Sequence, residues 1–404
     1  MNDGFNKIKW AEEWMKVIAK IREDFKREKP FEGMKISMAM HLEAKTAVLA
    51  LTLMDGGAQV SVAGCNPLST DDDVAISLKN DFGIDVHARR GMTSDEYYEN
   101  LRKVLSIKPN IIIDDGGDLT ALAIKNKDLS ENLIGGNEET TTGVIRLKSM
   151  EKAGVLKFPM FDVNDALMKH LFDNRYGTGQ STLDGIMNST NLIIAGKKVV
   201  VAGYGWCGKG IANRMKGMGA IVTVTEIDPF KAIEAKMDGF TVMPMEKAIE
   251  DADLVVTATG VKDVVTLEHV KRAKDGIILA NAGHFNNEVS VEEFEKVSKG
   301  IEVRRNVKRF NLFNKKVFVL ADGRLVNLAA GQGHPVEIMD LSFSIQALTA
   351  RYLAKNRPRD AKVYPVPEEV DRQVAEIFLK VNGIHIDKLT EEQLKYINSW
   401  EEGT

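Results

Sequence analysis

The sequence predicts an α/β protein with two doubly wound parallel-sheet domains joined by a hinge, and a short helical tail at its C-terminal end. Short apolar strands alternate with helix-forming segments in two blocks, one from Lys35 onward and one from about Lys197. Strands that alternate with helices form parallel sheets with both faces covered. A length of 404 residues is enough for two such domains.

An amphipathic helix is predicted before the first block. Its apolar residues recur at helical spacing and are Trp10, Trp14, Val17, Ile18 and Ile21. The segments KISMAM, AQVSVAG and PNIIID are then predicted as strands, with a helix from about Glu43 between the first two. Each strand is a short apolar run, as expected for a sheet that is buried on both faces.

The second block contains the predicted strands KKVVVAGYG, IVTVTE, LVVTATG and GIILANAG. Between the blocks, the glycines of YGTGQSTLDG predict a hinge, with Ser181 as a helix cap. After the second block, a helical apolar stripe in VEIMDLSFSIQALTARYL is expected to return the chain to the first domain. We therefore assign residues 1–178 and 335–366 to a substrate-binding domain, 179–334 to a dinucleotide-binding domain, and 367–404 to a C-terminal oligomerisation or tail segment.

Composition excludes several classes of protein. Hydrophobic residues make up 44% of the chain and charged residues 28%, which is an ordinary globular balance. The formal net charge of −4 gives no basic excess for binding nucleic acid or an anionic membrane. Two cysteines, Cys65 and Cys207, favour a reducing cytoplasm over a disulfide scaffold. Without a signal-peptide pattern or a run of about 20 apolar residues, we expect a soluble protein.

A glycine-rich turn marks the predicted cofactor site. Gly203, Gly205 and Gly208 fit the pattern G-x-G-x-x-G between a strand and a helix, and Glu226 ends the next strand. The glycines let backbone N–H groups approach a pyrophosphate, while the carboxylate accepts from a ribose 2′-OH and repels a 2′-phosphate. NAD is therefore predicted over NADP, with a purely structural tight turn as the alternative.

Further polar residues cluster where the strands of the first block end. Asp114 and Asp115 follow an apolar strand, at the edge where α/β sheets bind ligands. The three threonines of EETTTG can donate to a phosphate or a ribose, or can cap a helix. Lys169 and Asp173 share one face of a predicted helix, either within a site or as a surface ion pair. The scattered histidines show no metal-ligand spacing, so no metal is expected.

A series of motifs runs from about His41 to about Tyr396: MHLEAKTAVL, GCNPLSTDDD, DDGGDLT, EETTTG, KHLFDN, VVAGYGWCGKG, TEIDP, NAGHFN, RLVNL and GHP. In this order they resemble the S-adenosyl-L-homocysteine hydrolase family, in its shorter archaeal or thermophile-type branch. The resemblance implies reversible hydrolysis of S-adenosyl-L-homocysteine to adenosine and L-homocysteine. NAD⁺ would oxidise the ribose 3′-OH, homocysteine would be eliminated after loss of the C4′ proton, water would add, and the ketone would be reduced. It also implies a homotetramer.

The resemblance assigns roles to single residues. Asp115 would be the base at C4′, and Lys169, with a lowered pKa, would help to deprotonate the 3′-OH. The implied catalytic residues are His41, Asp115, Lys169, Asp173, Asn174 and His284, of which the histidines would handle water and the leaving thiol. Substrate contacts would fall on Glu43, Lys45, Asp115, Glu139, Lys169, Asp173 and His334, the last beside the purine. NAD contacts would fall on Thr140, Thr141, Thr142, Asn174, Gly203, Gly205, Gly208, Glu226, Asn281 and Asn327.

One departure from the family pattern concerns the purine. Many members read H-M-T-x-E where this chain has Glu43 and Lys45. An ionised Glu43 only accepts hydrogen bonds and Lys45 only donates them, which reverses the polarity toward the base and fits hypoxanthine. S-inosyl-L-homocysteine is therefore an alternative substrate, unless the two side chains pair with each other or turn to solvent.

Another departure lies at the end of the chain. The sequence finishes at NSWEEGT, where longer family members carry a basic and aromatic tail that reaches a neighbouring subunit's NAD. We expect weaker NAD binding than in those relatives. Two other interpretations are kept: an ordinary NAD-dependent dehydrogenase, which would accumulate free NADH, and a non-catalytic NAD-sensing relative, which would have lost some of Lys169, Asp173, Asp115 or His284.

Overall fold

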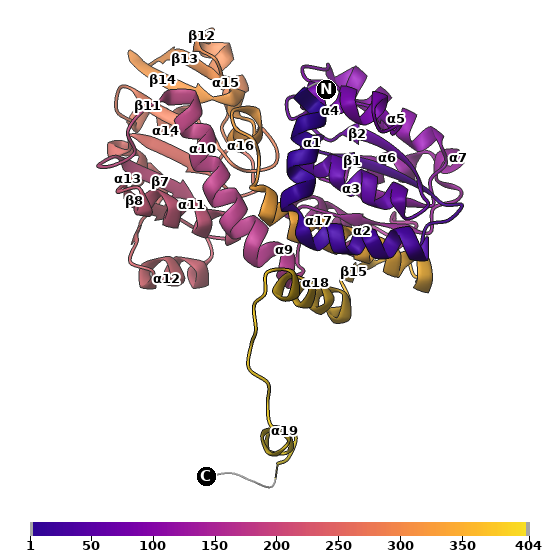
Figure 1. Cartoon of the computed structure of the whole chain (residues 1–404). Coiled ribbons are helices and arrows are strands. Elements are labelled where there is room, and N and C mark those ends of the chain that lie inside the picture. Colours follow the sequence, from indigo (N-terminus) through magenta and orange to yellow (C-terminus); the bar gives the residue numbers. More distant parts are fainter. Residues whose placement is uncertain (1–2, 401–404) are drawn as a thin grey trace.

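The computed structural model describes residues 3–400 and has two α/β modules side by side, each built on its own sheet (Figure 1). Sheet A has the strand order β15-β6-β5-β4-β1-β2-β3, and all neighbouring strands in it are parallel. Its strands are β1 (Lys35–Met40), β2 (Gln59–Gly64), β3 (Asp85–His87), β4 (Ile111–Asp114), β5 (Gly135–Glu138), β6 (Met160–Asp162) and β15 (Val363–Pro365). Because β15 lies so late in the chain, the C-terminal part returns to the first sheet.

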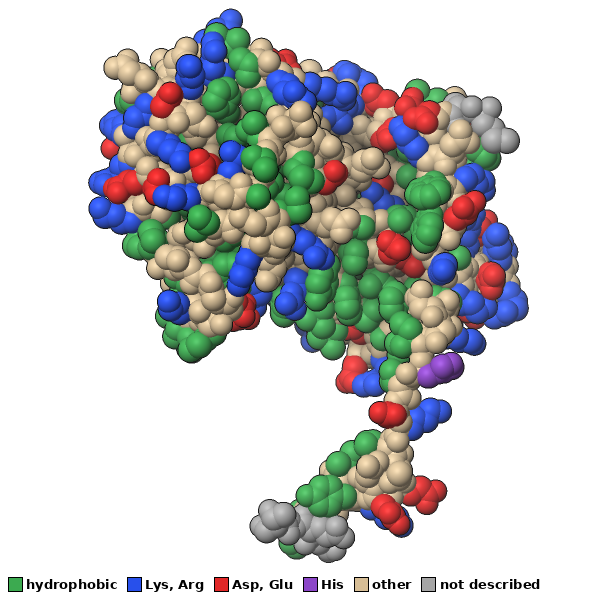
Figure 2. Space-filling view, turned by 60° about the vertical axis from the view of Figure 1, so that its left-hand side comes forward, with side chains coloured by type: hydrophobic (Ala, Val, Ile, Leu, Met, Phe, Trp, Pro, Cys, Tyr) green, Lys and Arg blue, Asp and Glu red, His purple; other side chains and the backbone are tan. Residues whose placement is uncertain are grey.

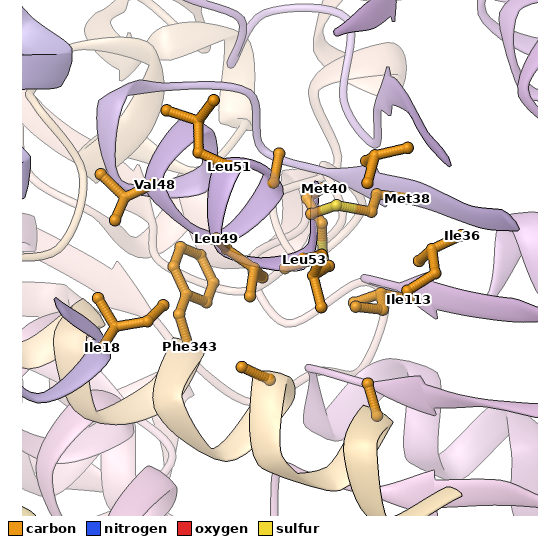
Figure 3. Close-up of a cluster of buried hydrophobic side chains, with 14 of the residues drawn as sticks. Ile18, Ile36, Met38, Met40, Val48, Leu49, Leu51, Leu53, Ile113 and Phe343 are labelled. Carbon is orange, nitrogen blue, oxygen red and sulfur yellow. The ribbon is translucent and has the colours of Figure 1, made fainter. Parts of the chain in front are cut away.

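Helices cover both faces of sheet A and form module A with it. They are α1 (Asp3–Trp14), α2 (Lys16–Glu28), α3 (Ala44–Asp55), α4 (Asp72–Asn80), α5 (Ser94–Ser106), α6 (Asp118–Lys125), α7 (Lys127–Ser130), α8 (Thr141–Lys152), α9 (Leu167–Lys169), α17 (Val336–Asn356) and α18 (Glu368–Val381). In Figure 3, Phe343 of α17 and Ile18 of α2 lie against α3 in the core, close to Leu49. This packing holds α17 beside the strands whose ends form the site.

The N-terminal segment differs from its prediction. The expected single helix is broken at Met15, whose backbone leaves the helical region, so that α1 and α2 bury separate faces. Met15 and Ile18 are fully buried, whereas Trp10 is 60% exposed and Trp14 is 40% exposed. The prediction that both tryptophans share the apolar face was wrong because a break turns the second helix relative to the first.

Sheet B has the order β12-β13-β14-β11-β10-β7-β8-β9. Its strands are β7 (Lys198–Ala202), β8 (Ile221–Thr225), β9 (Thr241–Val242), β10 (Leu254–Thr257), β11 (Ile277–Asn281), β12 (Ile301–Arg304), β13 (Val307–Leu312) and β14 (Lys315–Leu320). The six strands from β9 to β14 in this order are parallel and follow the dinucleotide-binding topology. The predicted fold class is confirmed, with an antiparallel addition of β12 and β13 that was not predicted.

The helices of sheet B complete module B. They are α10 (Thr178–Thr190), α11 (Trp206–Gly217), α12 (Pro229–Met237), α13 (Met245–Ala248), α14 (Leu267–Arg272), α15 (Val291–Val297) and α16 (Val326–Ala329), with short 3₁₀ turns η2 (Ile249–Asp251) and η3 (Ala321–Gly323). Two buried clusters, one on each face of the sheet, hold this module together.

The glycine-rich segment between the sheets is helical. A π-helix, η1 (His170–Gly177), joins α9 to α10 without interruption, and α10 runs along the near side of module B (Figure 1). Ser181 is not a helix cap, because it lies inside α10 and donates to the Gly177 carbonyl. A Cβ on Gly179 would come within 2.6 Å of the Gly210 backbone in α11. The glycine therefore permits close helix packing.

The last part of the described chain divides in two. α18 packs onto module A, where Val370 and Val374 are buried. Beyond it, residues 382–400 run away from the body and carry a short helix, α19 (Glu391–Ile397), with exposed side chains (Figures 1 and 2). A short helix is thus found where the tail was predicted, while its final residues, 401–404, lie outside the described part of the chain. Among residues 3–400, no helix is long and apolar enough to cross a membrane.

Candidate active site

A cavity of about 1370 Å³ lies between the carboxyl edges of the two sheets. Among the parallel strands of each sheet the order reverses once, between β1 and β4 in sheet A and between β7 and β10 in sheet B. Such switch points are where α/β sheets bind ligands. The loops that follow these strands line the cavity, so both modules contribute to one binding space.

Asp115 stands at the centre of the module A side. It follows β4, is 5% exposed, and its Oδ1 has no hydrogen-bond partner among residues 3–400. His41 Nε2 lies 3.7 Å from Oδ2, and His284 Nδ1 lies 3.7 Å from Oδ1. Burial raises the pKa of Asp115, although the nearby His284 and Lys169 oppose this shift. A buried carboxylate with a free oxygen and a raised pKa is suited to accept a proton.

The two histidines come from different modules and meet at Asp115. His41 follows β1, and its Nδ1 is 2.6 Å from the Ser69 hydroxyl. His284 follows β11 and sits so close to Gly116 that a Cβ there would overlap its ring. Burial lowers the pKa of His41 to about 3 and that of His284 to about 4. Both rings are therefore neutral near pH 7 and can each donate and accept a hydrogen bond.

Lys169 is the last residue of α9, directly before the π-helix η1, and a second polar group gathers around its amine. Its Nζ lies 2.9 Å from Asp173 Oδ2 and donates to Asn174 Oδ1 at 2.7 Å. Asp173 and Asn174, four and five positions after Lys169, both reach its amine because η1 is a π-helix. Such helices are often found at functional sites. Glu139 Oε1, from the loop after β5, lies 3.5 Å from the same Nζ. The surface ion-pair alternative is wrong, since Lys169 and Asp173 are both buried.

The charge state of Lys169 differs from the expectation. Burial alone would lower the pKa of this amine, but the carboxylates of Asp173 and Glu139 outweigh burial and raise it. The lysine remains an ammonium, so the expected lowered pKa was wrong. In turn, Lys169 and His334 hold the pKa of Asp173 well below its usual range despite burial. Lys169 is thus a hydrogen-bond donor and a positive charge rather than a neutral amine.

Helix α17 supplies residues that sequence reasoning missed. Ser342 donates its hydroxyl to Glu139 Oε1, and Gln346 Nε2 donates to Oε2 at 2.6 Å.

Asn164, in the loop after β6, was missed as well. It accepts from Asn174 Nδ2 at 2.9 Å and from the Thr141 hydroxyl at 3.2 Å. Asn164 follows β6, so its place after a parallel strand was the signal that could have found it. Nothing in the sequence around Ser342 and Gln346 indicated that they contact Glu139.

At the end of the cavity where the purine is expected, Glu43 and Lys45 form the pairing that the sequence left open. Lys45 Nζ lies 2.9 Å from Glu43 Oε2 and donates to the carbonyls of Gln332 at 2.9 Å and His334 at 3.0 Å. Its three protons are thereby engaged. His334 contacts the Asp173 carboxylate through Nδ1, and its Nε2 lies 3.3 Å from the Thr178 hydroxyl. The side chains of Glu43, Lys45, Asp173, Thr178 and His334 all line the cavity.

The module B side fits a dinucleotide. Gly203 adopts φ +94°, and a Cβ on Gly208 would overlap the Gly203 carbonyl oxygen, so both positions require glycine. Gly205 has open space around it and precedes the first N–H groups of α11. The Glu226 carboxylate follows β8, lines the cavity, and accepts from the Tyr204 N–H at 2.7 Å. A glycine cradle with this carboxylate beside it matches the requirements of NAD.

The remaining predicted NAD contacts divide into two groups. Asn327 lines the cavity, and its buried Oδ1 has no partner within the described chain. Thr140, Thr141 and Thr142 also line it, although Thr140 additionally caps α8 by accepting from Gly143 N–H. Asn281 lies outside the lining, because its amide donates to three backbone carbonyls and its oxygen accepts from Gly283 N–H and Thr257. It supports the loop that carries His284.

One group near Asp115 has metal-ligand character. His41, Cys65 and Asp115 each offer a ligand atom, and these atoms lie within 4.8 Å of one another. Both cysteines are free, and burial raises the pKa of the Cys65 thiol, which disfavours the thiolate that a metal needs. The expectation that the site holds no metal stays a prediction.

Comparison with a solved structure supports the fold alone. A dipicolinate synthase chain from Bacillus halodurans superimposes with a TM-score of 0.51 at 13% identity, covering 80% of this chain and 99% of that protein.

Comparisons of sequence reach further. Residues 1–134 match the model of S-adenosyl-L-homocysteine hydrolase, and residues 174–333 match the model of its NAD binding domain. An adenosylhomocysteinase of Thermoplasma acidophilum is 65% identical over 99% of this chain and 99% of its own length. An S-inosyl-L-homocysteine hydrolase of Methanocaldococcus jannaschii is 58% identical over 100% of this chain and 97% of its own length. The chain therefore belongs to the S-adenosyl-L-homocysteine hydrolase family and is an NAD-dependent enzyme of that family.

Proposed function

We propose that the chain catalyses the reversible hydrolysis of S-adenosyl-L-homocysteine to adenosine and L-homocysteine. The observation that carries this proposal is Asp115, whose unpartnered oxygen is buried between two neutral histidines, in a cavity shared with the glycine loop. A base in this position can remove a carbon-bound proton. An ordinary dehydrogenase moves only the proton of the substrate hydroxyl, which Lys169 and Glu139 can serve, so a further buried base favours elimination chemistry over simple hydride transfer.

The chain's own residues supply the proton transfers. Gly203, Gly205, Gly208 and Glu226 would hold NAD⁺, which would accept the hydride of the ribose C3′ and return it at the end of the cycle. The Lys169 ammonium donates to the 3′ oxygen and stabilises the negative charge that develops there. Glu139, whose pKa burial raises, takes the proton from that oxygen. Asp115 removes the C4′ proton, and this proton passes through His41 or His284 to the departing thiolate. When water enters, the same groups take its proton and return it to C4′.

S-inosyl-L-homocysteine is the second candidate substrate, and Glu43 favours it. Glu43 Oε1 lines the cavity and has only a 3.5 Å contact, from the Thr46 hydroxyl. Hypoxanthine N1–H can donate to this oxygen, whereas N1 of adenine cannot, and only the amino group of adenine could serve instead. Because the protons of Lys45 are engaged, the acceptor Glu43 carries the preference alone. The name of the Methanocaldococcus jannaschii relative supports this candidate.

Thiol and nucleoside release by the NAD-loaded protein tests both candidates. We expect release from S-adenosyl- and S-inosyl-L-homocysteine without accumulation of free NADH, and kcat/KM for the two substrates ranks them. Glu43→Gln, which can donate as well as accept, should shift the ratio toward the adenosyl substrate. Free NADH without thiol release would instead support a dehydrogenase, and an unchanged ratio would exclude Glu43 as the selecting group.

The remaining expectations also stand as proposals. We infer a cytoplasmic enzyme, supported by two free cysteines, that acts on a small molecule and binds neither nucleic acid nor membrane. We further infer a homotetramer in which the exposed arm of residues 382–400 contacts other subunits. Light scattering of the full chain tests this inference, and a monomer would contradict it. The domain boundaries predicted above are retained, with residues 179–334 binding NAD.

A further inference from the structure

The helical segment that carries Lys169 is held at its start by a carboxylate from a distant part of the chain. Asp371, on α18, accepts from the Leu167 N–H at 2.6 Å through Oδ2 and from the Met168 N–H at 2.8 Å through Oδ1. The partners are 204 and 203 residues apart in sequence. Asp371 is 9% exposed, and its neighbours Val370 and Val374 are buried in the core of module A.

This contact replaces a missing local cap. The first N–H groups of a helix have no partner within the helix, and a side-chain oxygen just before it normally satisfies them. Here the preceding residue is Ala166, which has no side-chain acceptor. A carboxylate at this end also interacts favourably with the helix dipole. The start of the segment therefore depends on α18 and not on its own sequence.

The placement of this contact bears directly on the site. Lys169 follows Met168 immediately, and the π-helix that begins at His170 brings Asp173 and Asn174 to the same amine. A π-helix is a rare and less favourable backbone conformation, so its position needs support from its surroundings. The two hydrogen bonds to the Asp371 carboxylate fix the position of the first turn along the helix axis and its rotation about that axis.

We propose that Asp371 is a positioning residue for the reaction: it sets where the Lys169 ammonium stands relative to the ribose. Asp371 lies outside the cavity lining, so it acts on the reaction only through the residues it holds. We call the two hydrogen bonds from Leu167 and Met168 to Asp371 the clamp; it is a property of the folded chain. Its effect on the reaction rests on the proposed function. Displacement of a catalytic group by about 1 Å can cost on the order of a hundredfold in rate.

The chain offers a matched control in Asp340. This carboxylate, on α17 and 3% exposed, accepts from Val17 N–H at 2.8 Å and Ile18 N–H at 2.7 Å in the first turn of α2. The geometry is that of Asp371, but no residue of α2 lines the cavity in the described chain. Loss of Asp340 therefore removes a buried cap from a helix that carries no lining residue, while α17 itself stays held by the apolar core around it.

The decisive experiment compares Asp371→Asn with Asp340→Asn in the full-length, NAD-loaded protein. In each variant an amide N–H₂ faces a backbone donor in place of a carboxylate oxygen. We expect Asp371→Asn to lower kcat about tenfold or more with KM within about twofold, whereas Asp340→Asn lowers the melting temperature but keeps kcat within about twofold. Equal losses of kcat in both variants, or wild-type kcat in a folded Asp371→Asn, would overturn the proposal.

Two further measurements keep the test independent of folding yield and of the substrate assignment. Asp371→Glu keeps both acceptor oxygens but displaces them, so kcat should fall between wild type and Asp371→Asn. If the Asn variant does not fold, wild-type kcat in Asp371→Glu overturns the proposal. Amide hydrogen exchange needs no substrate: protection should fall around residues 163–178 in the Asp371 variants and around 16–28 in Asp340→Asn. Unchanged protection at 163–178 would disprove the clamp itself, whereas a wild-type protein without hydrolase activity would disprove only the proposed function.

Discussion

At the scale of single residues, surroundings decide which groups carry charge. Lys169 is buried and the two histidines are partly buried, yet their pKa values move in opposite directions from their ordinary values. Two carboxylates beside the amine overcome the cost of burial, whereas the one carboxylate near the histidines, Asp115, does not. The sequence contains each of these residues but not their distances, which is why the charge of Lys169 was predicted wrongly while its place beside Asp173 was predicted correctly.

The neutrality of the histidines is directly measurable. Because burial lowers the pKa of His41 to about 3 and that of His284 to about 4, both rings should stay uncharged as the pH falls from 8 to 5.5. Ring-carbon and ring-nitrogen chemical shifts of the labelled protein report this state. Variants His41→Gln and His284→Gln assign the two signals. A ring at either position that gains its proton near pH 6.5 would contradict the assignment.

Removal of the Lys169 charge should affect both rate and stability. In Lys169→Met, Asp173 and Glu139 are left buried without their cation, which costs about 3–5 kcal/mol. Their pKa values then lie above those of the unfolded chain, so the free energy of unfolding should be higher at pH 5 than at pH 8. Hydrolysis should fall by at least about a hundredfold. Denaturant unfolding at both pH values measures the stability.

The control for this variant is Lys103→Met. Lys103 pairs with Glu99 on the surface, where such a pair contributes less than about 1 kcal/mol. Equal stability loss in the two variants, or a loss in Lys169→Met that does not diminish at pH 5, would refute the buried-charge account.

At the scale of elements, the sequence pattern predicted the strands, whose formation depends on their own apolar residues. β1, β4, β7 and β11 lie where their apolar runs placed them, because a strand buried on both faces is recognisable from composition alone. The π-helix has no such signature, since its 8 residues are too few for a changed hydrophobic period to be recognised. The break at Met15 likewise follows from packing rather than from a proline or glycine signal. The helical state of the glycines between the sheets, which were interpreted as a hinge, had no local signal either.

A pair of glycine substitutions tests the packing interpretation. Gly179→Ala places a methyl 2.6 Å from the Gly210 backbone, so α10 and α11 must separate, at a cost of about 1–3 kcal/mol. Gly217→Ala, also in a helix, adds the same methyl where nothing lies within 4 Å, and should be neutral or stabilising by up to about 1 kcal/mol. Thermal unfolding of both proteins compares them. A Gly179→Ala protein as stable as Gly217→Ala would show that the glycine serves flexibility instead.

At the scale of the whole molecule, the site exists only where the two modules meet. His284 and the glycine loop come from module B, and Asp115, Glu139 and Lys169 come from module A. Motif order predicted that these residues act together, but it could not predict the residues that hold them, such as Ser342 and Asp371 on helices more than 200 positions away. Contacts of that kind leave no periodic trace in a single sequence.

Contacts that cross between the modules should control ligand exchange. Arg90 Nη2 donates to the Ala329 carbonyl at 2.8 Å, which joins a loop of module A to α16 of module B. Its neighbour Arg89 forms an ion pair with Glu96 and donates to the Arg90 carbonyl at 3.4 Å, both inside module A, and this makes the two arginines a matched pair. Loss of one such hydrogen bond is worth about 1 kcal/mol, so Arg90→Gln should release bound nucleoside about fivefold faster than wild type. Arg89→Gln should match wild type, because it leaves the junction intact. Stopped-flow release of a fluorescent nucleoside analogue measures both rates, and equal rates in the two variants would show that this contact does not restrain separation of the modules.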